Sequence, residues 1–175
     1  FTNDTFGNPG LTTQKAVHYV LGYSHDFHTD VTLTIEGYYK KLWDLVVAGG
    51  EQTFDDIGTG RVYGGEIFLQ RKLSRDFFGW VSYGYSVSQR DDHDGQGEYR
   101  FNYDRTHIVN VILSCRIVSW FQAGVKWRYA TGLPVTKIIG SRYDADQGEY
   151  FPIYSSDYNG DRLPAYHKLD IRFDF

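Results

Sequence analysis

The chain has 175 residues, a formal net charge of −4 and a single cysteine, Cys115. These values argue against a nucleic-acid-binding protein, which carries a basic stripe, and against an internal disulfide framework or a zinc knuckle. The mean hydropathy is −0.46, and no window approaches the ~20 consecutive apolar residues that a membrane-spanning helix needs.

Seven segments place apolar or aromatic residues at odd positions and polar, charged or small residues at even positions. In chain order they are residues 15–27, 31–47, 61–73, 77–88, 107–117, 121–129 and 163–175. A period of two predicts β-strands that have one apolar face and one polar face. In the second segment this alternation assigns Leu45 and Val47 to the apolar face. Arg71, Ile108 and Ile112 break the pattern.

The polar face is too charged to be the interior of a small soluble sandwich, so we interpret the apolar face as facing lipid. A transmembrane β-strand needs only ~9–11 residues with every second one apolar, and the average hydropathy then stays low. Tyrosine, phenylalanine and tryptophan make up 18% of the chain, which suits a lipid–water boundary. An aromatic-rich soluble β protein has a similar composition and is the alternative.

The connections between these segments alternate between short and long. This alternation is typical of an outer-membrane barrel with tight periplasmic turns and long extracellular loops. It predicts extracellular loops at about residues 48–60, 89–106 and 132–162, and periplasmic strand ends near residues 27, 74, 117 and 175. The chain contains no methionine and starts at Phe1, so we expect it to be part of a longer protein.

Seven strands do not close a bacterial barrel, whose strand number is usually even. Many charged side chains would face its lumen, and burying them without water or partners would be costly. We therefore expect one arc of a wide barrel with a watery or plugged lumen. The predicted lumen-facing residues are Glu36, Lys40, Asp44, Glu66, Lys126, Arg128, Lys168, Asp170 and Arg172.

Short motifs support a more specific interpretation. They occur in order at residues 7–11 (GNPGL), 19–22, 36–40 (EGYYK), 64–66 (GGE), 103–107 (YDRTH), 128–135 (RYATGLPV) and 162–172 (RLPAYHKLDIR). Together they resemble the late barrel strands of TonB-dependent outer-membrane receptors, and the resemblance covers nearly the whole chain.

The resemblance implies a 22-stranded barrel that encloses an N-terminal plug and takes up a scarce ligand such as a metal–siderophore complex or cobalamin. The inner-membrane TonB complex would power uptake through the plug, which lies outside this chain. The implied partners are outer-membrane lipid, the remaining strands, the plug and a possible surface or assembly partner. Neither a cofactor nor enzymatic bond chemistry is implied.

The third expected loop supplies the candidate ligand-binding residues, which are Tyr143, Tyr150, Phe151, Tyr154 and Tyr158. Exposed aromatic side chains can stack on a ligand or grip a partner protein, although self-packing of a long loop explains them equally well. Asp144, Asp146 and Glu149 are weak calcium candidates, but turn formation accounts for the same residue types.

Two other functions remain as alternatives. A degenerate receptor barrel could be a structural subunit of a larger outer-membrane assembly. A rim-type outer-membrane hydrolase could use the acid–histidine cluster at residues 91–94, because a carboxylate can orient an imidazole base. A solvated charged loop explains this cluster more simply, and the chain lacks a G-x-S-x-G nucleophile motif, so we do not expect an enzyme.

Overall fold

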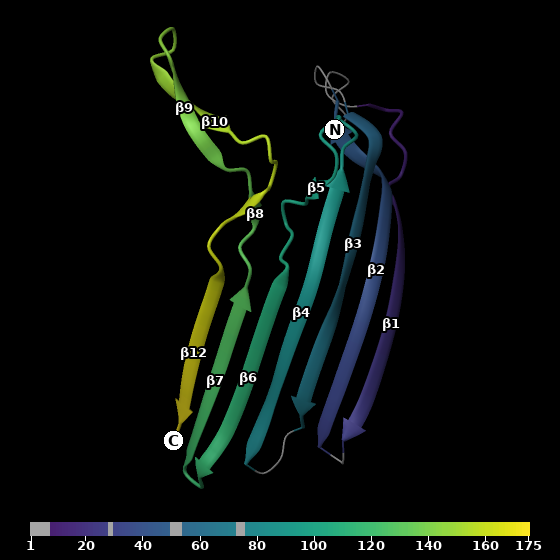
Figure 1. The fold of residues 1–175 in the computed structure, drawn as a ribbon. Helices are drawn as coiled ribbons and strands as arrows, with labels where there is room; N and C mark the ends of the chain where they lie inside the picture. Colours follow the sequence, from purple (N-terminus) through teal and green to yellow (C-terminus); the bar gives the residue numbers. More distant parts are fainter. Residues whose placement is uncertain (1–7, 28–29, 50–53, 73–75) are drawn as a thin grey trace.

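The computed structural model describes residues 8–27, 30–49, 54–72 and 76–175. These residues form one antiparallel sheet of long strands and contain no helix (Figure 1). The long strands, in their spatial order, are β1 (Lys15–Phe27), β2 (Val31–Ala48), β3 (Phe54–Arg71), β4 (Phe77–Asp91), β6 (His107–Val118), β7 (Phe121–Ala130) and β12 (Tyr166–Asp174). The short strand β5 (Tyr99–Arg100) pairs with β4. The predicted all-β antiparallel fold is confirmed.

The register keeps the two faces of the sheet separate. Among the seven long strands, and outside the bulges and the β6–β7 turn, every paired position joins two residues of the same parity, as in Tyr19↔Tyr39 and Gly64↔Ser86. Successive side chains on a strand point to opposite faces, so the even-numbered residues share one face and the odd-numbered residues share the other. We call these the even face and the odd face.

The assignment of Leu45 and Val47 to the apolar face was wrong. The pairing of β2 with β3 shifts between Leu42 and Leu45, and Asp44 has a φ of 56°, the left-handed geometry of a bulge. The extra residue moves the two aliphatic side chains to the even face, where they lie against Gly58. They are 8% and 6% exposed.

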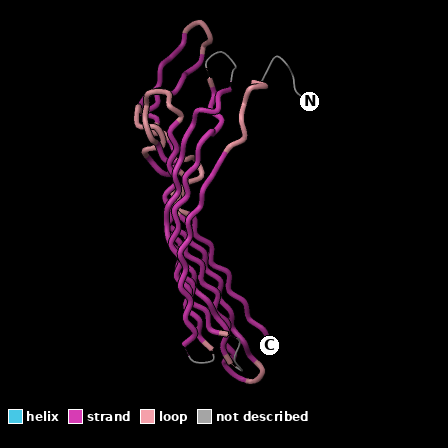
Figure 2. Tube along the Cα trace, turned by 90° about the vertical axis from the view of Figure 1, so that its right-hand side faces the viewer, coloured by secondary structure: helices cyan, strands magenta, loops and turns pink. Residues whose placement is uncertain are grey.

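The described residues do not form the closed hydrophobic core of a sandwich or other compact domain. Seen edge-on, the sheet is a single layer (Figure 2). The buried hydrophobic residues are Leu45, Val47, Val87 and Ala130, whereas every residue of β1 is exposed. Both faces of this sheet therefore require further material, whether lipid, water or polypeptide.

The long connections share one end of the sheet. Residues 54–60, expected in the first loop, belong to β3 instead. The last connection contains a neck formed by β8 (Pro134–Val135) and β11 (Asp161–Arg162), and a hairpin formed by β9 (Ile138–Asp144) and β10 (Glu149–Tyr154). The predicted strand end near residue 74 lies outside the described residues.

None of the described segments contains a helix long and apolar enough to cross a membrane.

Candidate functional site

The odd face is banded along the strands. Near the long connections, Tyr19, Tyr39 and Tyr63 form a row across β1, β2 and β3, and Tyr129 pairs with His167 at the opposite edge. A second row lies closer to the short turns; it starts at His25 on β1 and continues with the apolar side chains of Leu33, Leu69, Val81, Val111, Trp127 and Leu169. The tyrosine row thus lies nearer the long connections than a row that is apolar except for His25.

Phenylalanine side chains lie on the odd face at the short-turn end of the strands. Phe121 has its ring centroid 5.9 Å from that of Phe173 and 5.3 Å from that of Phe175. Arg71, the cation that broke the sequence pattern, has its guanidinium carbon 5.2 Å from the centroid of the Phe77 ring. A cation above an aromatic face is stabilised there without an acidic partner.

The even face is polar and hydrogen-bonded across the strands. Asn110 donates to Ser82 at 3.1 Å, and Gln122 donates to Ser114 at 2.7 Å. The register also places eight of the nine predicted lumen residues on this face, namely Glu36, Lys40, Glu66, Lys126, Arg128, Lys168, Asp170 and Arg172. The ninth residue, Asp44, lies in the bulge and forms an ion pair with Lys15 at 2.6 Å.

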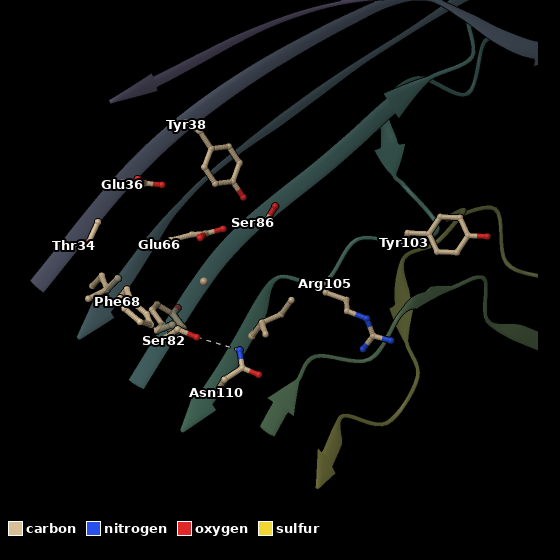
Figure 3. Close-up of a pocket in the computed structure, with 14 residues that line it drawn as sticks. Thr34, Glu36, Tyr38, Glu66, Phe68, Ser82, Ser86, Tyr103, Arg105 and Asn110 are labelled. Atoms are coloured by element: carbon tan, nitrogen blue, oxygen red, sulfur yellow. Dashed lines mark hydrogen bonds between the residues drawn. The ribbon is translucent and has the colours of Figure 1, made fainter. Parts of the chain in front are cut away.

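Two carboxylates meet at the centre of the even face. Glu36 pairs directly with Glu66 across β2 and β3, and both line a hollow of about 610 Å³. Tyr103 and Arg105 lie across this hollow, on the connection that follows β5 (Figure 3). Among the described residues, neither glutamate has an ion-pair partner, so the hollow combines an unneutralised acidic wall with a basic and aromatic wall.

The strands at the other edge of the sheet bring two cations together. Arg128 pairs with Lys168 across β7 and β12, and Lys168 also lies 3.3 Å from Asp170. Like charges directly opposite each other destabilise a sheet. The even face therefore has an acidic pair and a basic pair on different strands; Asp170 offsets part of the charge of the basic pair, whereas no described cation forms an ion pair with the acidic pair.

The even face also contains apolar side chains. Trp80 pairs with Ile112, its ring centroid lies 5.7 Å from that of Phe68, and Ile108 lines the acidic hollow. These residues interrupt the polar surface without being buried.

The structure brings together only some of the predicted ligand-binding aromatics. Tyr143 and Tyr150 pair across the β9–β10 hairpin, with ring centroids 5.0 Å apart. Phe151 and Tyr154 belong to the same hairpin. Tyr158 lies apart from it and forms an edge-to-face contact with Tyr99 at 4.9 Å.

One of the carboxylates considered for calcium, Asp144, has local partners. Asp144 accepts hydrogen bonds from the backbone amides of Asp146 and Gln147, at 3.0 and 3.4 Å, which is the role of an aspartate in a turn. Throughout the described ranges, no three His, Cys, Asp or Glu side chains converge on a metal-sized site.

The acid–histidine cluster is also part of a turn. Asp91 accepts a hydrogen bond from the backbone amide of His93 at 2.8 Å, and its carboxylate lies 3.7 Å from the His93 ring. The other ring nitrogen lies 3.4 Å from the Thr59 hydroxyl. His93 has a φ of 56°, which agrees with a turn position.

A buried polar cluster at the base of the loops was not predicted. It consists of Asp104, Asn159 and Arg162, and we call it the loop-base cluster. Asp104 is 2% exposed and Asn159 is 5% exposed. Their contacts join residues 56 to 59 positions apart, so local patterns do not reveal them. Nearby, burial raises the pKa of Tyr99, and so does its hydrogen bond to Asp92 at 2.8 Å.

Comparisons with known proteins identify the fold. The chain matches the ferric-catecholate import receptor Fiu from E. coli K12, in its closed form, with a TM-score of 0.68 and 16% sequence identity over 95% of its length. It matches the F3-3 variant of the FrpB iron transporter from Neisseria meningitidis with a TM-score of 0.66 and 11% identity over 96% of its length. Neither protein-family models nor curated protein sequences give a match.

These similarities define the class of fold. The chain has the barrel-like fold of TonB-dependent receptors, as the sequence motifs had indicated. It spans 22% and 25% of the lengths of the two matching structures.

Proposed function

We propose that this chain is one arc of the barrel wall of an outer-membrane TonB-dependent receptor, which takes up a scarce ligand such as a metal–siderophore complex or cobalamin. The proposal rests on the two opposite faces of the sheet: the odd face has rows of aromatic and apolar side chains, and the even face is charged. Eight residue steps separate Tyr19 from Phe27, about 26 Å along a strand. The apolar band of an outer-membrane barrel is ~25 Å tall and flanked by aromatic girdles.

In this proposal the odd face contacts lipid and the even face lines the lumen. The acidic pair Glu36–Glu66 and the basic pair Arg128–Lys168 then contact the plug, whose side chains supply opposite charges. Both matching structures, an import receptor and an iron transporter, support the transport class. The outer loops select the ligand, and TonB acts through the plug.

Uptake by whole cells tests the proposal. Cells that lack the gene are compared with cells that carry it on a plasmid, using radiolabelled ferric–catecholate complexes and cobalamin at nanomolar concentrations. We expect plasmid-dependent accumulation of one ligand, which a protonophore abolishes because TonB requires the inner-membrane proton gradient. Surface binding without accumulation, together with copurification of a stable partner, would instead support a structural subunit.

A further inference from the structure

Asp104 is the centre of the loop-base cluster. It lies in the connection between β4 and β6, and its carboxylate receives hydrogen bonds from the Ser88 backbone amide at 2.7 Å and the Thr106 hydroxyl at 3.2 Å. Arg100 lies 3.5 Å away, and Arg162 forms a closer ion pair. The carboxylate is therefore fully satisfied, although its side chain is 0% exposed.

Arg162 comes from the other long connection, at the end of the β8–β11 neck. Its guanidinium donates to the carbonyl oxygens of Gly132 at 2.8 Å and Asp104 at 3.2 Å, and to the Thr106 hydroxyl at 2.7 Å. The Arg162 side chain thus binds backbone atoms of both the β4–β6 connection and the β7–β12 connection. Removing Arg162 is expected to be costly, because the buried Asp104 carboxylate would keep only the more distant Arg100 as an ionic partner.

Asn159 makes a second junction between the same connections. Its side-chain amide donates to the carbonyl oxygen of Arg100 at 2.8 Å and to the side-chain oxygen of Asn102 at 2.6 Å. Its backbone amide donates to the Thr136 hydroxyl at 3.1 Å. Its φ of 56° is a geometry that glycine and asparagine tolerate best.

The β9–β10 hairpin begins two residues after Thr136 and ends five residues before Asn159, so it extends directly from this junction. Ser155 donates its backbone amide to Lys137 at 2.8 Å, just above the neck. Beyond that point, substantial packing between described elements joins β9 only to β10. The position of the Tyr143–Tyr150 pair over the arc is therefore set at the base of the hairpin.

We propose that Asp104, Asn159 and Arg162 are positioning residues. They join the β4–β6 and β7–β12 connections into one rigid body. They thereby fix the orientation of the β9–β10 hairpin, which contains Tyr143 and Tyr150, in the ligand-free protein. The inference deepens the proposed function, because a preorganised hairpin lowers the ordering cost of binding.

Distance measurements between spin labels test the positioning directly. Labels are attached to Gln96→Cys and Ser141→Cys in the full protein, with Cys115→Ser throughout. We expect one narrow distance distribution, which Arg162→Gln and Asn159→Gly each broaden at least twofold. Asn159→Gly keeps the backbone geometry available, so it remains informative if Arg162→Gln fails to fold. Arg172→Gln, at an exposed arginine paired with Asp174, is the matched control and should leave the distance distribution unchanged.

The half-saturating ligand concentration for uptake is a second measurement, and a purely structural role of the three residues would not change it. With the ligand found in the uptake assay, Arg162→Gln should raise the half-saturating concentration at least fivefold and leave the maximal rate unchanged. A broad distribution in the unsubstituted protein, or a narrow one in both variants, would overturn the inference. An unchanged half-saturating concentration would also overturn it. If the unsubstituted protein transports nothing, the proposed function fails, and the distances still decide the positioning.

Discussion

Glu36 and Glu66 lie directly opposite each other on β2 and β3, flanked in the same row by Gly22 and Gly84. The glycines place no side chain beside the two carboxylates. The like-charged pair thus faces an open hollow, where its countercharge must come from outside the sheet.

Neutralising one member of this pair should change the stability of the protein, and the sign of the change depends on whether water or plug side chains contact the carboxylates. If only water contacts the carboxylates, Glu66→Gln relieves a repulsion and stabilises the protein by about 0.2–1 kcal/mol. If cationic plug side chains contact them, as we expect, the same change removes a charge-assisted hydrogen bond and destabilises the assembled barrel by about 1.5–3 kcal/mol. Heat-induced unfolding followed by gel mobility measures the difference, and Glu149→Gln in the exposed hairpin is the control.

The bulge at Asp44 gives a second prediction. Its φ of 56° suits glycine or asparagine and disfavours β-branched residues. We expect Asp44→Val to destabilise the protein by about 1–3 kcal/mol relative to Asp44→Gly. Denaturant unfolding of both variants checks this, and equal stabilities would contradict the left-handed bulge.

A third prediction concerns Gly132, at the start of the neck. A Cβ atom there would lie 1.7 Å from the carbonyl oxygen of Leu163, so the backbone must move to admit it. Gly132→Ala should therefore loosen the β7–β12 connection and expose residues 132–162 to limited proteolysis. Gly124→Ala is the control, because its nearest contact would be an ordinary 3.7 Å.

Asp56 gives a prediction about pH. The Thr12 hydroxyl and backbone amide donate to its carboxylate at 2.5 and 2.8 Å, and these bonds lower the pKa of Asp56 below its usual value of 3.8. The stabilising contact is thus fully present above pH 3.8 and is lost as the pH falls through the lower, folded-state pKa. Hydrogen exchange at the Thr12 amide should accelerate in that acid range relative to neighbouring amides. In Asp56→Asn this pH dependence should disappear.

The sequence predicted the strands and the two faces because alternation is a local property that is visible in every segment. The bulge escaped prediction since Asp44 fits the polar half of the alternation as well as it fits a left-handed turn. Residues 54–60 contain Asp55, Asp56 and two glycines, which are typical of a loop, but pairing with β2 and β4 holds them in β3.

The candidate site was predictable only in part. Residues such as Glu36 and Arg128 were placed on their face by parity alone. The loop-base cluster depends on contacts between distant parts of the chain, and its only local signs were Asp104 inside the YDRTH motif and Arg162 at the start of the RLPAYHKLDIR motif. The split of Tyr158 from the other loop aromatics likewise follows from its packing on Tyr99.

The surroundings of the odd face can be measured at two adjacent residues of β6. Spin labels are placed at Val111→Cys and Asn110→Cys in a Cys115→Ser background, and the full protein is reconstituted into liposomes. Collision rates are then compared for oxygen, which concentrates in lipid, and for a water-soluble nickel complex. We predict that the label at residue 111 meets oxygen freely and the nickel complex rarely, and that the label at residue 110 is far less accessible to oxygen. A label at residue 111 that meets the nickel complex freely, or that is shielded from both reagents, would contradict a lipid-facing surface.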